Sequence, residues 1–267
     1  MHYVPHSEAE RKEILEKVGV KDPAELLSHL PEAIRYKRVA ELPTPLSERE
    51  VARRLKRMAG KNVVPTDSGD NSFLGAGAYY HYVPAVVDSL SSRGEFFSSY
   101  TPYQGEISQG NLQAGFEFQS LIASLAGLDV ANASVYDGAN AMTESFFMAK
   151  RIHRKGNVAL VCDSIHPDYL AVLNTYAAGL FEVVTVATDD ASGTIDLDDL
   201  KTKLNDNNVF AFAIQSPNYF GCIDSVEEAF QIAKASGAIN IHVVAEAMSL
   251  AALRSPGELG ADIFAGE

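Results

Sequence analysis

Five short apolar runs in the second half of the chain limit its fold more than any other feature of the sequence. The runs are rich in Val, Ile, Ala or Phe and cover residues 158–162, 182–186, 209–214, 239–244 and 263–265. Helical windows lie before and between them, near residues 84–92, 112–126, 139–152, 167–178, 197–205 and 225–236. Runs without polar alternation are typical of strands buried on both faces, and strands separated by helices predict right-handed parallel crossovers. The sequence therefore predicts an α/β domain with a mainly parallel sheet.

The start of the chain follows a different pattern, with helix-start signals and no strand-like run. A capping box begins at Ser7, and a further helix start stands at Ser47. In such boxes a serine side chain and a following glutamate satisfy opposite backbone donors at a helix N-terminus. We expect a helical segment over residues 1–61, followed by a large α/β domain over residues 62–267.

Composition argues against two classes of partner. The chain has 22 Lys and Arg against 35 Asp and Glu, a net charge of −13. Nucleic-acid binding depends on basic surface, so no nucleic-acid partner is expected. A membrane-spanning helix needs about 18 or more consecutive apolar residues, and the sequence contains no such stretch. No membrane association is therefore expected.

The two cysteines and the first residues bear on the compartment. Cys162 and Cys222 lie far apart at the ends of apolar runs, which favours free thiols in a reducing cytosol over a disulfide. The first residues hold no apolar run of signal-peptide type. We therefore expect a cytoplasmic protein. The sequence has no Cys-x-x-Cys spacing, so no metal site is predicted.

Two loops ahead of the sheet are unusually rich in tyrosine, glycine and amide side chains. Residues 73–84 contain a Gly-x-Gly that follows no predicted strand, so a dinucleotide fingerprint is not expected. The residues that follow, Tyr79, Tyr80, His81 and Tyr82, form either a buried aromatic plug or a pocket wall. Residues 100–111 hold two tyrosines, two glutamines and a threonine. Hydroxyls and amides can bind the carboxylate or amine of a small polar ligand without carrying charge. A rigid interface loop remains the alternative for this second loop.

Three polar residues lie where predicted strands end or helices begin. Asp137 precedes a helix, either as a plain cap or as part of an anion site at the helix N-terminus. His166 and Glu246 each follow a predicted strand. Carboxyl ends of parallel strands share one edge, where ligands bind, so we expect these two side chains above the same edge. For His166 alone, a hydrogen-bonded loop residue is the more ordinary interpretation.

Several blocks of the sequence resemble one known family. They are residues 73–84, 93–104, 106–110, 127–134, 136–139 and 260–263, and the most specific part is the Tyr-Thr-Pro-Tyr-Gln…Glu-Ile-Ser-Gln-Gly block. Over essentially its entire length the chain resembles the glycine decarboxylase, or P-protein, of the glycine cleavage system, and in particular the first subunit of the two-subunit bacterial form. The resemblance implies the large domain of a fold-type-I pyridoxal-phosphate (PLP) enzyme, similar to aspartate aminotransferase.

The resemblance also implies a reaction and two protein partners. Glycine would be decarboxylated on PLP, and its aminomethyl group would pass to the lipoyl arm of the H-protein. No lysine follows Lys234, and Ala245–Glu246 stands where such enzymes place an aspartate against the pyridine nitrogen. We therefore expect the Schiff-base lysine and the bound PLP to belong to the partner, subunit 2, whose active site this chain completes.

By the same resemblance, particular residues are expected to serve the site. The substrate-facing group, expected to be catalytic, comprises Tyr100, Thr101, Tyr103 and Gln104, supported by Glu106, Ser108 and Gln109. His166, Asp137 and Glu246 are expected to line the chain's own degenerate cofactor pocket. The family continues into a smaller C-terminal domain, so the stop after Glu267 is expected to reflect a truncation. Two alternatives remain: an inactive scaffold or regulatory remnant of the same fold, and an independent aminotransferase or desulfurase, which the missing lysine disfavours.

Overall fold

The computed structural model describes residues 6–35, 41–64, 69, 71–73, 75, 79–99, 101–102, 104–206 and 208–267. The chain divides into two compact units, with the division between Asn71 and Ser72. The boundary that the sequence predicts, between residues 61 and 62, lies slightly earlier and stays a prediction.

The first unit is helical, as its capping signals predict. It contains α1 (Glu8–Val18), the 3₁₀ turns η1 (Pro23–Leu27) and η2 (Glu32–Ile34), and α2 (Glu48–Ala59). The predicted capping box forms at α1, where the Ser7 backbone N–H donates to Glu10 Oε2 at 2.7 Å. Ser47 and Glu50 form the same arrangement at α2. Serine and glutamate at this spacing satisfy helix-start amides that would otherwise have no partner.

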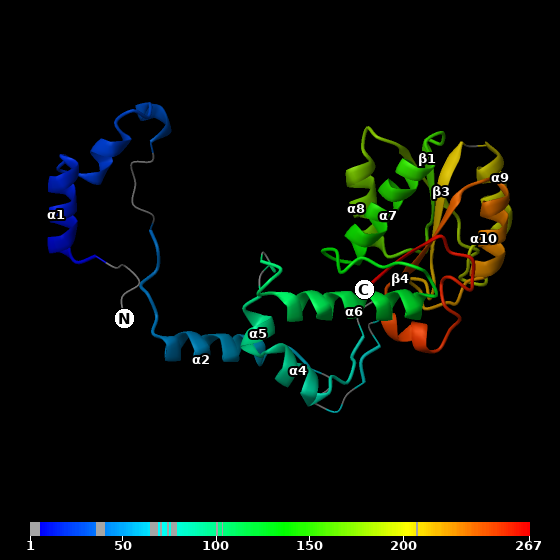
Figure 1. Ribbon diagram of the computed structural model, residues 1–267, viewed down its shortest axis with the longest axis horizontal. Coiled ribbons are helices and arrows are strands. Elements are labelled where there is room, and N and C mark those ends of the chain that lie inside the picture. Colours follow the sequence, from blue (N-terminus) through cyan, green and yellow to red (C-terminus); the bar gives the residue numbers. More distant parts are fainter. Residues whose placement is uncertain are drawn as a thin grey trace. The chain divides into compact units, whose positions relative to one another are not determined.

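The second unit is built on a parallel sheet of five strands. The strands are β1 (Val158–Cys162), β2 (Glu182–Val186), β3 (Val209–Gln215), β4 (Ile239–Val244) and β5 (Ile263–Gly266), in the order β2-β1-β3-β4-β5. Each neighbouring pair is parallel. The predicted α/β architecture is confirmed, and all five apolar runs are strands because helices cover both faces of the sheet (Figure 1).

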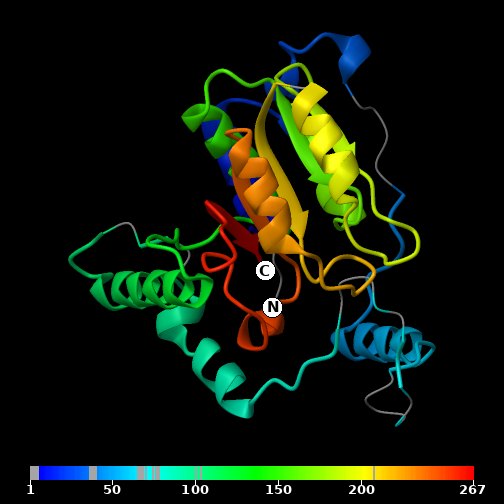
Figure 2. The same ribbon diagram turned by 90° about the vertical axis from the view of Figure 1, so that its right-hand side faces the viewer.

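Alternate residues of β1 enter two separate cores. Ala159 and Val161 of β1 pack with α7 (Gly138–Ile152) and α8 (Pro167–Ala177). Leu160 and Cys162 pack on the opposite face, against α9 (Leu197–Asp206) and α10 (Val226–Ala235). Figure 2 shows α9 and α10 lying across the sheet. This two-sided burial explains why the strands lack polar alternation.

Ahead of α7, the described part of the second unit contains a further group of helices. They are α4 (Ala85–Ser91), α5 (Gly94–Phe97) and α6 (Gln109–Ala126). The C-terminal end of α6 is fixed where the Gly257 N–H donates to the Ala126 carbonyl at 2.8 Å. Gly127 then ends the helix with a φ of 68°, a left-handed conformation that favours glycine. Among the described residues, no helix is long and apolar enough to cross a membrane.

Candidate functional site

The carboxyl ends of β1 and β3 are joined by hydrogen bonds into one edge. The His166 backbone N–H donates to Gln215 Oε1 at 2.8 Å, and the Tyr219 N–H donates to the Ser164 carbonyl at 2.9 Å. These bonds join the loop after β1 to the loop after β3. The expected ligand edge is therefore held by backbone and amide contacts.

His166 lies at this edge and begins α8. Its ring packs against Tyr169 and Tyr219, with centroid distances of 5.2 and 5.3 Å. Its Nδ1 accepts the Asp168 N–H at 3.2 Å and so caps the helix. Accepting at Nδ1 leaves Nε2 as the protonated nitrogen of the neutral ring. The hydrogen-bonded interpretation of this histidine agrees with these contacts, and its role toward a cofactor stays a prediction.

Asp137 caps α7, the other helix that begins near this edge. Its Oδ1 accepts the Asn140 backbone N–H at 2.8 Å and the Asn140 side-chain amide at 2.9 Å. These bonds, the backbone one first, hold the pKa of the Asp137 carboxyl below its usual range. Its carboxylate is thus used within its own helix turn, as the capping interpretation predicts.

A second carboxylate reaches the first turn of α7 from β5. The Gly138 N–H donates to Glu267 Oε2 at 3.0 Å, and the Tyr169 hydroxyl donates to Glu267 Oε1. Burial, reinforced by the hydrogen bond and charge of Glu267, raises the pKa of Tyr169. Tyr169 therefore remains a protonated donor. Sequence patterns did not identify the contact of Tyr169 and Glu267 with Gly138. The only signal was Gly138 itself, since a glycine after a helix cap permits close approach of another group to the backbone.

Glu246 follows β4 and is engaged by a residue from the aromatic segment near residue 80. Its Oε2 lies 3.1 Å from His81 Nε2, and its Oε1 accepts the Met248 N–H at 3.1 Å. From the sequence, His81 was interpreted only as part of an aromatic plug or a pocket wall, and its contact with Glu246 was not predicted. Its neighbours Tyr80 and Tyr82 are exposed, Tyr82 by 89%. The interpretation of these tyrosines as a buried plug is therefore wrong for this chain.

The predicted substrate loop lies on exposed chain ahead of α6. Tyr100 and Tyr103 fall outside the described residues. Thr101 and Gln104 are exposed. The Gln104 carbonyl accepts the Ser108 N–H at 2.9 Å and so forms the turn that begins α6.

The residues expected to support this loop occupy the same turn. Glu106 and Gln109 are exposed, and Ser108 is half-buried. Within the described ranges, no hydrogen bond joins this turn to His166, Asp137 or Glu246. The roles of both sets of residues stay predictions.

A buried acid, also missed in the sequence, shapes the loop after β3. Asp224 Oδ1 accepts the Ile195 N–H at 2.7 Å, and its Oδ2 accepts the Asn218 amide at 2.9 Å. Burial raises the pKa of Asp224. Asn218 Oδ1 in turn accepts the N–H groups of Phe220 and Cys222, both at 3.0 Å. This network fixes the loop by satisfying donors that burial removes from water.

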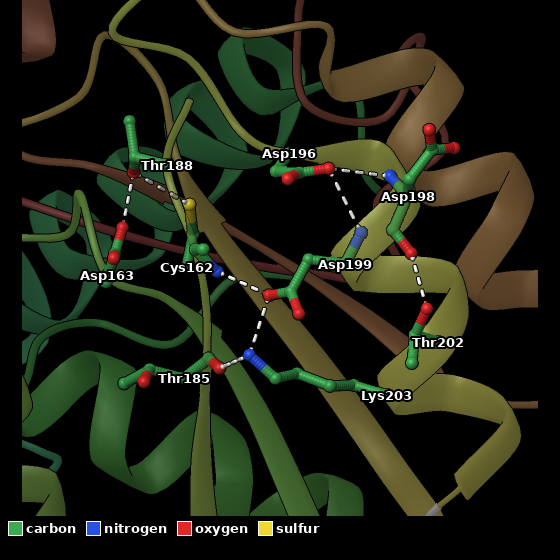
Figure 3. Close-up of polar contacts among 10 residues, drawn as sticks. Cys162, Asp163, Thr185, Thr188, Asp196, Asp198, Asp199, Thr202 and Lys203 are labelled. Carbon is green, nitrogen blue, oxygen red and sulfur yellow. Dashed lines mark hydrogen bonds and ion pairs between the residues drawn. The ribbon is translucent and has the colours of Figure 1, made fainter. Parts of the chain in front are cut away.

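A polar cluster at the β2 edge of the sheet is structural (Figure 3). Asp199 Oδ2 accepts the Ala187 N–H at 2.7 Å and Lys203 Nζ at 2.6 Å, and Lys203 also donates to the Thr185 carbonyl at 2.6 Å. These bonds fix α9 against the end of β2. Beside them Cys162 is buried and free, and burial raises the pKa of its thiol.

Free thiols were predicted, and both cysteines are free. Over the part of the chain that the structure describes, no group of three His, Cys, Asp or Glu side chains could hold a metal ion.

Comparisons with known proteins give one consistent result. The family model described as the glycine cleavage system P-protein matches residues 1–267. A probable glycine dehydrogenase (decarboxylating) subunit 1 from Solibacter usitatus is 46% identical over 268 residues, covering 100% of this chain and 58% of the relative. The relative of the same name from Aquifex aeolicus is 40% identical, with 100% of this chain and 59% of the relative covered. The chain thus spans about three-fifths of the length of these curated relatives.

Solved structures agree with the family match. A crystal structure of glycine decarboxylase (P-protein) of the glycine cleavage system, in inhibitor-bound form, is 39% identical with a TM-score of 0.83, covering 100% of this chain and 58% of that one. A sphingosine-1-phosphate lyase of Burkholderia pseudomallei, 16% identical with a TM-score of 0.56, covers 80% of this chain and 51% of that one and shares the fold alone. The predicted fold, the large domain of fold-type-I PLP-dependent enzymes, is confirmed.

Proposed function

The chain belongs to the glycine cleavage system P-protein family, and we propose that it acts in glycine decarboxylation by completing the active site of a partner subunit. The partner, subunit 2, supplies the Schiff-base lysine and holds PLP. PLP supplies the electron sink for decarboxylation, and the aminomethyl group passes to the lipoyl arm of the H-protein. The relatives named glycine dehydrogenase (decarboxylating) subunit 1 support this assignment.

The observation that carries the proposal is that the groups at the chain's own pocket do not fit PLP. A PLP site needs a lysine, an acid at the pyridine nitrogen and free donors for the phosphate. Here Glu246 is engaged by His81 and the Met248 N–H, and the Gly138 N–H is engaged by Glu267. Because these groups are already bonded within the chain, they support the proposal that the cofactor is bound by the partner.

In this proposal the loop ahead of α6 provides what the chain contributes to catalysis. The hydroxyls of Tyr100, Thr101 and Tyr103 and the amide of Gln104 orient the carboxylate and amine of glycine by neutral hydrogen bonds. Glu106, Ser108 and Gln109 hold the turn that presents them. The exposure of Thr101 and Gln104 in the isolated chain supports a role at an interface.

Large apolar side chains on α5 and α6 support the presence of a partner. Phe97, Phe116 and Leu121 are exposed, Phe116 by 70%. Exposed apolar side chains in such density are typical of surfaces that another protein covers. These helices flank the proposed substrate loop in sequence, so a partner that covers them would also reach that loop.

Reconstitution tests the proposal. The chain is purified alone and with a lysine-bearing subunit 2, and the exchange of labelled CO2 with the glycine carboxyl is measured with lipoyl H-protein present. We expect no exchange from the chain alone and exchange from the pair. Gln104→Ala should lower the exchange rate of the pair by about tenfold or more, because an orienting hydrogen bond is lost. Gln113→Ala, at an exposed glutamine on α6 bonded to Glu117, is the matched control.

Two results would contradict the proposal. A lysine-bound PLP absorbance from the chain alone would mean that it holds its own cofactor. Unchanged exchange in the Gln104→Ala complex, together with unchanged exchange in a Tyr103→Phe complex, would favour the inactive scaffold instead.

A further inference from the structure

The carboxylate of Glu267 lies at the first turn of α7. A helix N-terminus favours an anion at this position. We propose that Glu267 is a built-in anionic ligand that closes this position to phosphate groups. The inference rests on the proposed function, because it gives the physical reason why this chain leaves PLP to its partner. It goes beyond that function because it assigns the exclusion of phosphate to a single side chain, Glu267.

Two donors converge on the Glu267 carboxylate, one on each oxygen. The Gly138 N–H, in the first turn of α7, donates to Oε2 at 3.0 Å, and the Tyr169 hydroxyl donates to Oε1. First-turn amides have no partner within their helix, and the positive end of the helix dipole favours a negative group there. Asp137 caps the Asn140 N–H instead. The carboxylate of Glu267 therefore engages the amide that a phosphate would need.

The position also leaves no room for a second anion. A Cβ built on Gly138 would overlap the Tyr169 hydroxyl and come within 2.9 Å of the Glu267 carboxyl carbon. Tyr169 is only 4% exposed. The helix backbone, the phenol and the carboxylate are thus in close contact. A phosphate could bind only if the Glu267 side chain left.

The sheet, rather than a loose loop, places Glu267. β5 pairs with β4 up to Val244–Gly266, and the Glu267 N–H continues that ladder by donating to the Val244 carbonyl at 3.3 Å. Tyr169 is likewise fixed, because it lies in α8 within the core formed by α7, α8 and the sheet. Both partners are therefore held in position before any ligand arrives, as a preorganised site requires.

The test removes the carboxylate and measures phosphate binding. Inorganic phosphate and, separately, pyridoxal phosphate are titrated calorimetrically into the wild-type chain and into Glu267→Ala, which empties the position. We expect phosphate affinity to rise about tenfold or more in Glu267→Ala, because both donors become free for a charge-assisted bond. Glu182→Gln is the matched control, since this exposed glutamate lies on β2, at the opposite edge of the sheet. It should bind phosphate no better than the wild-type chain.

Circular dichroism shows whether Glu267→Ala folds. If it does not fold, Glu267→Gln is used in its place. Glutamine keeps the side-chain volume but is a weaker acceptor, so the Gly138 amide proton should move upfield in the NMR spectrum and phosphate should still be excluded. An unmoved Gly138 resonance would overturn the proposal. A folded Glu267→Ala with no gain in phosphate affinity, or a wild-type chain that binds phosphate equally well, would also overturn it.

These outcomes are separate from a failure of the proposed function. A wild-type chain that forms a lysine-bound PLP absorbance contradicts the proposed function. Absence of a phosphate gain in Glu267→Ala contradicts only the role of Glu267, because the proposed function is tested by the exchange activity of the reconstituted pair.

Discussion

His242 on β4 should make the stability of the α/β unit depend on pH. Its side chain is buried, at 3% exposed, and its ring packs edge-on against Phe230 of α10 at a centroid distance of 6.0 Å. Neither ring nitrogen has a hydrogen-bond partner among the described residues. Burial lowers the pKa of His242 to about 4, and the smaller effect of the Ser216 backbone acts in the opposite direction.

The sign of the effect follows from which state binds the proton first. The unfolded chain protonates this histidine near its ordinary pKa of 6.5, whereas the folded chain protonates it only near 4. Between these values the unfolded state binds more protons, so the free energy of unfolding falls as the pH falls. Each pKa unit corresponds to about 1.4 kcal/mol, so the full loss is about 3 kcal/mol.

His242→Leu is the perturbation that isolates this effect. Leucine removes two buried nitrogens without partners, and a cavity of about 220 Å³ beside the ring leaves room for the new side chain. We expect its free energy of unfolding to stay within about 1 kcal/mol of wild type near pH 7. At about pH 4.5 it should exceed the wild-type value by about 2–3 kcal/mol, because only the wild-type chain loses stability through this group.

Urea unfolding followed by far-UV circular dichroism measures both values. Asp224 lines the same cavity, and its raised pKa changes stability with pH in the opposite direction. This contribution is present in both proteins, so it cancels in the difference between them. Replacing the exposed His29 by leucine serves as the control and should reproduce the wild-type pH dependence. If wild type and His242→Leu differ by the same amount at both pH values, the reasoning is refuted.

Two further changes test the packing at α7 and at the β2 edge, both by urea unfolding near neutral pH. Gly138→Ala should lower the free energy of unfolding by about 1–3 kcal/mol, because its Cβ would overlap Tyr169. Gly110→Ala, where a Cβ would meet nothing within 4 Å, should not be destabilising. Lys203→Met should lower the same quantity by about 1 kcal/mol through the loss of two hydrogen bonds, of which the one to Asp199 is partly buried. Lys201→Met removes only an exposed ion pair and should lower the free energy of unfolding less than Lys203→Met does.

The strands and the helices around the sheet were predictable because their signals are local. The run at 209–214 is apolar without alternation, and both faces of β3 are buried. Asp137 reads as a cap in the sequence and caps α7 in the structure. In both cases the sequence pattern lies within a few residues of its physical cause. For the strand this cause is burial of both faces of the sheet, and for the cap it is a helix amide without a partner.

The side-chain contacts at the carboxyl edge of the sheet were not predictable, because they join residues that lie far apart in the sequence. Tyr169 meets Glu267 across 98 positions, and His81 meets Glu246 across 165. No periodicity links residues so far apart, because each pair meets only when separate elements dock on one sheet edge. The expectation that Glu246 lines the chain's own pocket came from the family resemblance and from its place after a predicted strand, and it could not include a histidine from a distant loop.

The carboxyl edge of this sheet is satisfied by the chain's own carboxylates. Glu267 accepts from Gly138, Glu246 from Met248, and Asp224 from Ile195. A pocket that awaits a cofactor must keep such donors free, and buried donors without partners are costly. Here these donors are satisfied within the fold itself. This arrangement agrees with the proposed function, in which the chain keeps the architecture of a PLP enzyme and contributes to catalysis through the loop ahead of α6.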